Sequence, residues 1–362
     1  MQLDKIKRKM RLEERIKVMR EVAKWLDGSV KNEANPQIAA WLEKWDGAVM
    51  REHFHHSWFI PEFVREAASA LSRMILGEDG HALERWLEPY RPALEAHAGG
   101  RRVGVVMAGN IPLVAFHDFL CVFMAGDRFV GKMSSHDTRL WPLLFELLEI
   151  ISPEAARQVE PVQGPWGGVD AVIATGSDNS SRYFEYYFGK LPHIIRGHCN
   201  GVAVLDSGES SEELHGLAKD ICLYFGMGCR NVSKIFVPQG YDFAPLFAAL
   251  DDFRPQLAFH HSYLNNLEYQ KTVHLINSIP FLDQGICMFK ENGAISSPIG
   301  VTHYAFYNNL ADVWPQLSGP EVQCVVSRLQ GEGVGTVPPG MSQYPALGQY
   351  ANGVDTMKFL LS

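Results

Sequence analysis

The stretch Gly226-Met-Gly-Cys229-Arg-Asn-Val-Ser-Lys-Ile-Phe-Val-Pro238 decides how the rest of the sequence is interpreted. A helical pattern leads into it, and a strand-like apolar run begins just after the cysteine. The glycines beside Cys229 allow backbone conformations that a side chain would forbid, and they leave room near the sulfur. The flanking charges of Arg230 and Lys234 favour a thiolate. We therefore expect Cys229 to be a nucleophile that forms a thioester.

The alternative for Cys229 is a buried and unreactive thiol, because free cysteine is among the residue types most often buried. The chain has six cysteines and no C-x-x-C pair, so a zinc ribbon or a thioredoxin motif is not expected. The cluster of His53, His55 and His56 lacks the carboxylate or cysteine spacing of a tetrahedral metal site, and we expect no metal.

Composition limits the classes of function. The net charge of −8 disfavours nucleic-acid binding, which needs a basic face. The N-terminal stretch mixes Lys and Arg with Glu, unlike a signal peptide. No run of about 18 apolar residues predicts a membrane span. These features predict a cytoplasmic protein with free thiols.

The length of 362 residues predicts about two domains. Helical apolar spacing is expected through residues 1–98, with a break at Pro89 and Pro92. Strands and helices then alternate, which predicts an α/β fold with parallel sheets covered on both faces. A Gly- and Pro-rich segment, 331–350, predicts an extended loop. The expected strands are 102–107, 128–132, 169–174, 193–196, 202–205, 234–237, 287–289 and 299–303, and the expected helices from residue 101 onward are 113–125, 138–151, 178–188, 211–224, 241–250 and 265–278.

Polar residues follow three of the predicted strands. These are Ala108-Gly-Asn110-Ile-Pro112, Lys132-Met-Ser-Ser-His136 and Thr175-Gly-Ser177. Ligands of doubly wound sheets bind beyond the carboxyl ends of the strands. The third segment also begins a helix, where free backbone N–H groups can hold a phosphate. The G-x-G-x-x-G dinucleotide fingerprint does not follow any of these strands.

The order of these segments resembles the aldehyde dehydrogenase superfamily. Its members share, in this order, an asparagine-containing loop, a lysine at a strand end, a threonine-glycine-serine turn, a glutamate-containing segment and a cysteine nucleophile. The resemblance covers about residues 100–358, and its matching segments are Asn110-Ile-Pro112, Lys132-Met-Ser-Ser135, Ala174-Thr-Gly-Ser177, Ile194-Ile-Arg-Gly-His198 and Gly226-Met-Gly-Cys229.

Within that superfamily the chain looks most like the fatty acyl-CoA reductases of the bacterial luminescence type. The segments that carry this closer resemblance are Met107-Ala-Gly-Asn-Ile-Pro-Leu113, Tyr183-Phe-Glu-Tyr-Tyr-Phe188, Gly228-Cys-Arg-Asn-Val-Ser-Lys234 and Gly353-Val-Asp-Thr-Met-Lys358. The resemblance implies two doubly wound, Rossmann-like domains preceded by a helical segment. The expected division is 1–98 (helical), 99–205 (cofactor-binding), 206–330 (catalytic) and 331–362 (oligomerisation).

The resemblance also implies roles for individual residues. Cys229 would hold the acyl group, and Asn110 would stabilise the oxyanion together with the Cys229 backbone N–H. The cofactor residues would be Lys132, Ser134 and Ser135 along the adenosine ribose and Thr175, Gly176 and Ser177 near the pyrophosphate. The alternatives are a turn-forming role for Asn110 and a solvated strand-end role for Lys132.

The chain departs from the family at the hydrolytic base. The glutamate that activates water in aldehyde-oxidising members would fall at about Ile195, followed by Arg196, and neither side chain is a base. The family's second glutamate, which holds the nicotinamide ribose, has no match near residues 295–298. His193 and His198 flank the vacant position. They are candidate proton donors, with a structural role as the alternative.

These departures favour an NADPH-dependent acyl-CoA reductase that yields an aldehyde. Ser134 and Ser135 replace a ribose-binding carboxylate, which favours NADP(H), although the nearby Asp137 leaves NAD(H) open. The substrate would be an acyl-CoA or an acyl carrier protein. The C-terminal segment packs across a subunit in the family, so a homodimer or higher homo-oligomer is expected. The alternatives are a non-reducing acyl-transfer or acyl-binding protein, and a semialdehyde dehydrogenase that acts on an acyl phosphate.

Overall fold

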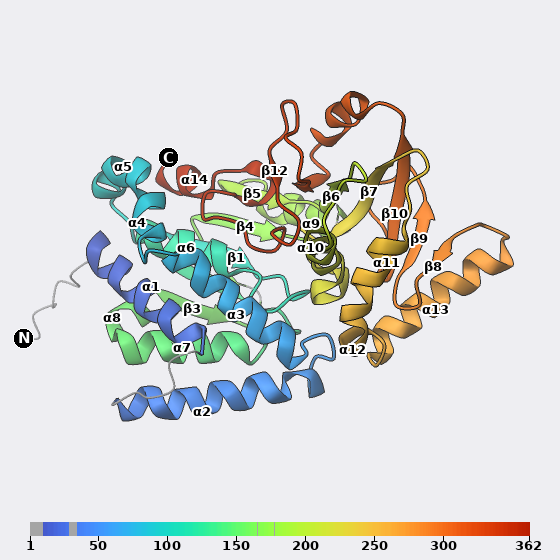
Figure 1. The fold of residues 1–362 in the computed structure, drawn as a ribbon. Coiled ribbons are helices and arrows are strands. Elements are labelled where there is room, and N and C mark those ends of the chain that lie inside the picture. Colours follow the sequence, from blue (N-terminus) through green and yellow to red (C-terminus); the bar gives the residue numbers. More distant parts are fainter. Residues whose placement is uncertain (1–9, 29–34, 165, 177) are drawn as a thin grey trace, which may run out of the picture.

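The computed structural model describes residues 10–28, 35–164, 166–176 and 178–362. Within these ranges the chain forms two sheets that lie side by side, with helices around both (Figure 1). Residues 1–9 of the expected N-terminal helical pattern and Ser177 of the expected pyrophosphate turn lie outside the described residues.

The first sheet is parallel throughout and has the strand order β3-β2-β1-β4-β5. Its strands are β1 (Arg102–Val106), β2 (Arg128–Lys132), β3 (Val159–Val162), β4 (Ala171–Thr175) and β5 (His193–Arg196). The order reverses between β1 and β4. In doubly wound sheets such a reversal opens a crevice at the carboxyl ends of the two strands, and ligands bind there.

Helices cover both faces of this sheet, as the alternating pattern predicts. On one face lie α6 (Phe116–Ala125), α7 (Leu140–Ile151) and the short α8 (Pro153–Ala156). Trp141 of α7 stacks on Phe129 of β2, with ring centroids 6.3 Å apart. On the other face, α9 (Asp178–Phe188) follows β4, and Trp166 packs between Gly104 and Phe188. The expected helix 113–125 begins only at Phe116, because Leu113 has a φ of 55° and lies in a turn.

The first two N-terminal helices pack on α6 and α7, and the third packs on the first. The Trp41 indole N–H donates to the carbonyl of Leu143 over 2.7 Å, which joins the second helix to α7. The predicted break at Pro89 and Pro92 is confirmed, because a 3₁₀ turn that contains Pro89 separates the last two helices. These helices are α1 (Leu12–Leu26), α2 (Pro36–Arg51), α3 (Pro61–Leu76), α4 (Ala82–Leu87) and α5 (Arg91–Ala96).

The second sheet has the order β12-β11-β6-β7-β10-β9-β8 and is parallel except for the β8–β9 pair. Its strands are β6 (Asn200–Val204), β7 (Val232–Pro238), β8 (Leu282–Asp283), β9 (Met288–Glu291), β10 (Val301–Tyr307), β11 (Val322–Val326) and β12 (Thr336–Val337). Its helices are α10 (Ser211–Cys222), α11 (Ala244–Leu250), α12 (Arg254–Leu257) and α13 (His261–Ile276).

The C-terminal segment crosses from the second sheet back to the first. After β12 it runs over the molecule and ends in α14 (Thr356–Leu361), which packs on α6 of the same chain (Figure 1). Asp355 caps this helix by accepting from the Lys358 N–H over 2.8 Å. Met357 and Leu360 are fully buried. The role of this segment in oligomerisation stays a prediction.

Candidate active site

The loop that carries Cys229 begins with an abrupt end to α10. A 3₁₀ turn, η3 (Leu223–Gly226), contains three consecutive residues with positive φ: Tyr224 (53°), Phe225 (57°) and Gly226 (73°). Such values are costly for bulky residues. The rings of Tyr224 and Phe225 are buried against Phe63 of α3, so packing holds the turn. The turn reverses the chain and presents Cys229 before β7 begins.

Asn231 fixes the same loop from inside. Its side-chain oxygen accepts from the Gly228 N–H over 2.8 Å. Its amide nitrogen donates to the carbonyls of Asp220 (2.8 Å) and Leu223 (2.9 Å), at the end of α10. Asn231 is buried, so these three bonds satisfy backbone groups that water cannot reach. The position of the cysteine is therefore set by both the turn and this side chain.

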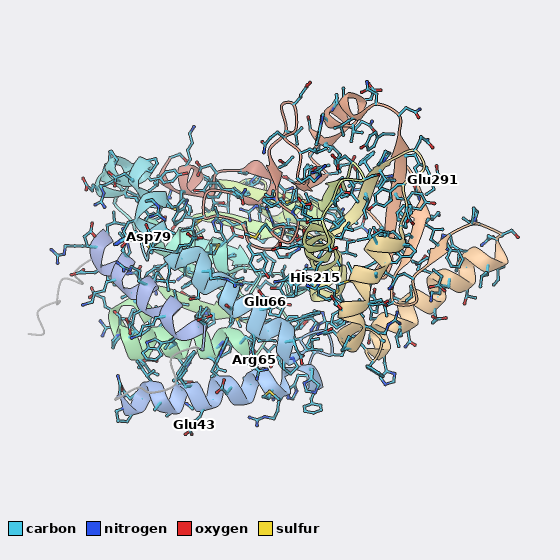
Figure 2. The ribbon with its side chains drawn as sticks, in the orientation of Figure 1. Glu43, Arg65, Glu66, Asp79, His215 and Glu291 are labelled. Atoms are coloured by element: carbon cyan, nitrogen blue, oxygen red, sulfur yellow. The ribbon has the colours of Figure 1, made fainter. Side chains whose placement is uncertain are left out.

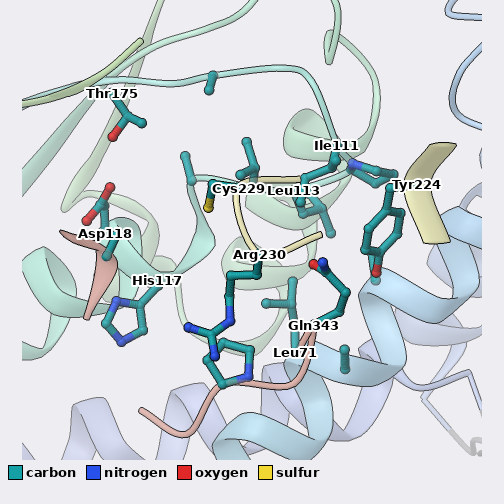
Figure 3. Close-up of a pocket in the computed structure, with 18 of the residues that line it drawn as sticks. Leu71, Ile111, Leu113, His117, Asp118, Thr175, Tyr224, Cys229, Arg230 and Gln343 are labelled. Carbon is teal, nitrogen blue, oxygen red and sulfur yellow. The ribbon is translucent and has the colours of Figure 1, made fainter. Parts of the chain in front are cut away.

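Cys229 is exposed and lines a pocket of about 210 Å³ (Figure 3). Asp118 and Thr175 lie on one side of the sulfur, and Leu71 and Tyr224 lie toward α3. The pocket is predominantly apolar, and its walls include α3, the loop after β1 and the C-terminal crossing. Its lining residues include Ala67, Ala70, Leu71, Met74, Ile111, Pro112, Leu113, Val114, Tyr224, Gln343, Tyr344 and Pro345.

The surroundings of the Cys229 thiol favour its charged form. The Cys199 thiol lowers the pKa of Cys229 to about 7, and the charges of Arg230 and Arg196 act in the same direction. The expected contribution of Arg230 is thus supported. Lys234 does not have the role expected for it, because its ammonium donates to the carbonyl of Asn292 and is buried there.

The second positive charge that acts on Cys229 comes from Arg196 and not from Lys234. The sequence alone did not indicate this role for Arg196. Its guanidinium is buried and donates to both carboxylate oxygens of Asp118, over 2.9 and 2.8 Å. It also donates to the hydroxyls of Thr356 (2.8 Å) and Thr175 (3.5 Å). The only signal for this pair was a histidine and an aspartate, His117 and Asp118, within an otherwise apolar helix.

The structure brings Asn110 next to the cysteine loop. Its side-chain nitrogen donates to the carbonyl of Met227 over 2.8 Å, two residues before Cys229. An amide has two N–H groups, so one donor remains for an oxyanion. Asn110 is exposed, as a residue that meets a substrate must be. Its oxyanion role stays a prediction.

The expected cofactor residues lie at the carboxyl edge of the first sheet. Lys132 ends β2 and is exposed, and Ser135 is exposed just beyond it. Ser134 packs so closely on Gly109 that a Cβ at 109 would lie 2.8 Å from the Ser134 Cβ. Close backbone approach of this kind is a reason for glycine at that position.

The remaining expected cofactor residues follow β4. Thr175 ends that strand and lines the pocket of Cys229. A Cβ at Gly176 would lie 2.8 Å from the Cβ of Ser180, so glycine allows α9 to begin close to the strand. The two groups of residues therefore flank the crevice between β1 and β4.

The two histidines proposed as proton donors lie away from the sulfur. His193 begins β5, at the amino end of the strand, and its Nδ1 bonds the carbonyl of Leu191 over 2.7 Å. His198 is exposed and its Nε2 bonds the Ser296 hydroxyl over 3.3 Å. Neither lines the pocket, whereas His117 does. The His117 ring bonds the carbonyl of Leu347 over 2.9 Å, which favours a structural role.

A charged network around Glu66, which is labelled in Figure 2, holds α3 in place as one wall of the pocket. Glu66 of α3 accepts from Arg73 over 2.9 Å and lies 3.7 Å from the ammonium of Lys219 on α10. The Tyr344 hydroxyl donates to the same carboxylate, and the Lys219 ammonium lies 4.7 Å from the Tyr344 ring centroid. The N-terminal helical segment is thereby fixed to α10 and to the C-terminal crossing.

The described residues contain neither a metal-binding cluster nor a membrane-spanning helix. No group of three or more His, Cys, Asp or Glu side chains in residues 10–28, 35–164, 166–176 and 178–362 is arranged to hold a metal ion. Across the same ranges, no helix has the length and apolar character needed to cross a membrane.

Among the comparisons with known proteins, only the one with solved structures finds similar proteins. No family model matches the sequence, and no curated protein matches it. Solved structures do match. Aldehyde dehydrogenase 21 from Physcomitrella patens, in complex with the reaction product succinate, is 14% identical with a TM-score of 0.66, over 97% of this chain and 84% of that chain.

Two further solved structures are similar. An NAD-dependent aldehyde dehydrogenase from Sinorhizobium meliloti is 13% identical with a TM-score of 0.62, over 89% of this chain and 71% of that one. Succinic semialdehyde dehydrogenase from Streptococcus pyogenes, in complex with NADP+, is 13% identical with a TM-score of 0.60, over 88% and 78%. The chain has an aldehyde dehydrogenase-like fold. The predicted fold class is confirmed, and the closer resemblance to fatty acyl-CoA reductases stays a prediction.

Replacing Asn231 tests how the nucleophile loop is held. Asn231→Ala leaves two buried carbonyls and one N–H without partners, so we expect the free energy of unfolding to fall by about 2–4 kcal/mol. Urea denaturation measures this change. Asn266→Ala is the matched control, because Asn266 is exposed and donates only to the carbonyl of Ser262. We expect that variant to change stability by less than about 0.5 kcal/mol. Equal losses of unfolding free energy in the two variants would show that Asn231 does not hold the nucleophile loop.

Proposed function

We propose that this protein is an NADPH-dependent acyl thioester reductase that forms a covalent acyl intermediate on Cys229. The observation that carries the proposal is the combination of a readily ionised thiol with an apolar pocket that offers no free carboxylate. Asp118 is the one acidic residue among the described residues that line the pocket. Its two oxygens are bound by the buried guanidinium of Arg196.

The Asp118–Arg196 pair bears directly on hydrolysis of the intermediate. A general base needs a carboxylate that can accept a proton from water. An adjacent guanidinium stabilises the charged carboxylate and occupies its lone pairs, so Asp118 is a poor base. An acyl group on Cys229 is thus protected from water and persists until it is reduced or transferred. This favours thioester reduction over aldehyde oxidation.

The residues of the chain supply most of the required chemistry. The Cys229 thiolate attacks the thioester carbonyl carbon, forms a new C–S bond and expels the donor thiol as its thiolate. The second N–H of Asn110 and the backbone N–H of Cys229 are the donors proposed for the oxyanion. A bound nicotinamide dinucleotide supplies the hydride that reduces the acyl carbon. Cleavage of the C–S bond then releases the aldehyde and restores the thiolate.

The carboxyl edge of the first sheet fits a dinucleotide. Gly109 and Gly176 allow close backbone packing on the two sides of the crevice between β1 and β4. Lys132 is exposed, and no ion pair engages it in the part of the chain that the structure describes. Its charge is available to a phosphate, and Ser135 beside it is an exposed hydroxyl.

The structure also bears on the choice between NADPH and NADH. Asp137, the carboxylate that left NADH open, is buried and accepts from the Leu113 N–H over 3.1 Å. Burial raises the pKa of Asp137 to about 7. Its carboxyl group therefore holds the loop after β1 and is not offered to a ribose. Lys132 without a neighbouring exposed carboxylate favours a 2′-phosphate, and we propose NADPH as the preferred cofactor.

The shape of the pocket supports an apolar acyl group. Ala70, Met74, Tyr344 and Pro345 line both the pocket of Cys229 and a larger groove of about 980 Å³ that opens between α3, α4 and the C-terminal crossing. An acyl chain bound to the sulfur can extend past these residues toward the groove. This arrangement favours long chains over the short charged acyl phosphate of a semialdehyde dehydrogenase.

Covalent labelling tests the nucleophile. Incubation with an acyl-CoA and no cofactor should add one acyl mass to the wild type, and Cys229→Ala should add none, because the attacking sulfur is gone. Intact-protein mass spectrometry measures both. Cys287→Ala is the control, because Cys287 is buried in the second domain and bonds Thr302. Acylation that survives in Cys229→Ala would overturn the mechanism. Acylation without reduction by NADPH would favour the acyl-transfer alternative.

Replacing Ala70 with phenylalanine tests the path of the acyl chain. The larger ring narrows the passage between pocket and groove, so we expect kcat/KM for palmitoyl-CoA to fall at least about tenfold, with a smaller change for butyryl-CoA. Steady-state kinetics with both substrates measure this split. Arg65→Phe, an exposed position on the same helix (Figure 2), is the control and should leave the ratio unchanged. An equal loss of kcat/KM on both substrates would mean that the acyl chain does not run through this passage.

A further inference from the structure

A glutamine in the wall of the Cys229 pocket has an unused hydrogen-bond donor. Gln343 lines the pocket and is half-buried, and its Nε2 nitrogen is buried with no hydrogen-bond partner among the residues that the structure describes. Its amide lies on Gly228, the residue before the nucleophile. A Cβ at Gly228 would lie 3.3 Å from Oε1 and 3.6 Å from Nε2 of Gln343. Buried polar groups are nearly always hydrogen-bonded, so an unpaired donor at this place needs an explanation.

We propose that Gln343 is a specificity-determining residue whose amide binds the first amide of a pantetheine arm, which a short ethylene link joins to the thioester sulfur of the donor. The inference rests on the thioester substrate proposed above. It adds that the chain recognises the thiol of that substrate as well as its acyl group.

The two halves of such a thioester differ in the groups that they offer to Gln343. A saturated acyl chain has no polar group beyond its carbonyl. The groove proposed for that chain shares residues with the pocket, and Gln343 is not among them. The polar groups nearest to the reacting carbon are therefore those of the thiol. Its amide has an N–H and a carbonyl, and a glutamine amide can donate to the carbonyl and accept from the N–H.

The nicotinamide of the cofactor also carries an amide, but the cofactor is expected from another direction. The residues proposed to bind it include Thr175 at the end of β4. Figure 3 shows Thr175 and Gln343 on opposite sides of the Cys229 sulfur, with Gln343 toward Tyr224. This placement favours the thiol of the donor as the partner of Gln343.

The backbone is held on both sides of Gln343. The Ser342 N–H donates to Asp220 over 3.0 Å, and the Ser342 carbonyl accepts from the guanidinium of Arg230. On the other side, the Tyr344 hydroxyl donates to the charged network on α3. The torsion of a terminal amide is soft, so the N–H groups of Gln343 can turn toward a substrate while the backbone stays in place.

The unpaired donor gives the pocket a preference among thiols. A buried donor without a partner costs free energy, and an acceptor on the substrate recovers that cost on binding. A site that hydrogen-bonds a polar group of its substrate rejects an analogue that lacks the group. Gln343 should therefore favour a thiol with an amide at this position over an alkyl thiol.

The test compares the decanoyl thioesters of N-acetylcysteamine and of pentanethiol, whose thiols have similar lengths. The first thiol has the amide and the second does not. Intact-protein mass spectrometry measures the rate of Cys229 acylation without cofactor in the wild type and in Gln343→Met, which keeps a side chain of similar length without a donor. We expect the ratio of the two rates to fall about tenfold in the variant, because the thiol amide loses its partner. The difference between the leaving groups is the same in both proteins and cancels.

Gln316→Met is the matched control, because Gln316 is exposed and donates to the carbonyl of Asp312 over 2.7 Å, away from the pocket. It should leave the ratio unchanged. Urea denaturation should show no loss of stability in Gln343→Met, because no hydrogen bond of Nε2 is removed. An unchanged ratio in Gln343→Met, with Cys229 still acylated, would overturn this inference alone. If neither thioester acylates the wild type, the proposed function fails together with it.

The same amide occurs in coenzyme A and in acyl carrier protein, and a second pair of substrates distinguishes these two sources. Acylation by decanoyl-CoA and by decanoyl-acyl carrier protein is measured in the same way. The donor that reacts faster with the wild type is the source of the arm, and its rate should fall about tenfold in Gln343→Met. A fall of less than about twofold for that donor would contradict the role of Gln343.

Discussion

The buried guanidinium of Arg196 connects the parts of this molecule that must come together at the site. It binds Asp118 on α6, Thr175 at the end of β4 and Thr356 on α14, and its charge acts on Cys229 from the first sheet. A charge taken out of water is costly unless partners surround it. The partners of Arg196 come from three separate segments, so the pocket is complete only when β5, α6 and the C-terminal helix are all in place.

The same pair is the basis for proposing that this dehydrogenase-like fold carries out a reduction. Where a water-activating carboxylate would be needed, the pocket has Arg196, and the carboxylate present is bound to it. The arginine thus does two things: it stabilises a thiolate, and it removes a base. Asn231 and the left-handed turn at Tyr224–Gly226 then fix where that thiolate lies. The electrostatics and the backbone of the site together support the persistent acyl-enzyme that we propose.

The sequence predicted the alternating strands and helices of the core well, because buried segments have a local pattern of apolar residues. The apolar runs of β1, β2 and β4 and the loop around Cys229 were all found in their correct places. The strand β3, Val159–Val162, was missed because it contains a proline and a glutamate and lies at the sheet edge, where such residues are tolerated. The late start of α6 was missed because nothing local indicates the left-handed conformation of Leu113.

The sequence indicated those contacts of the candidate site that join neighbours along the chain, and it missed those that join distant residues. Cys229 and Arg230 are adjacent, and Asn110 lies in a recognisable loop. The partnership of Arg196 with Asp118 joins residues from different elements, and no spacing rule connects them. For Lys234 the prediction was wrong in the opposite way. Lys234 is close to Cys229 in sequence, but on its strand the ammonium donates to the carbonyl of Asn292.

We propose that an acyl thioester on Cys229 is reduced and not hydrolysed. The most direct measurement is NADPH oxidation with palmitoyl-CoA, together with quantitation of the aldehyde and the free fatty acid released, and repeated with NADH. We expect one aldehyde to form for each NADPH consumed, with little fatty acid released and slower turnover with NADH. Release of fatty acid as the main product, or rapid NADP+-dependent oxidation of the aldehyde to the acid, would contradict it.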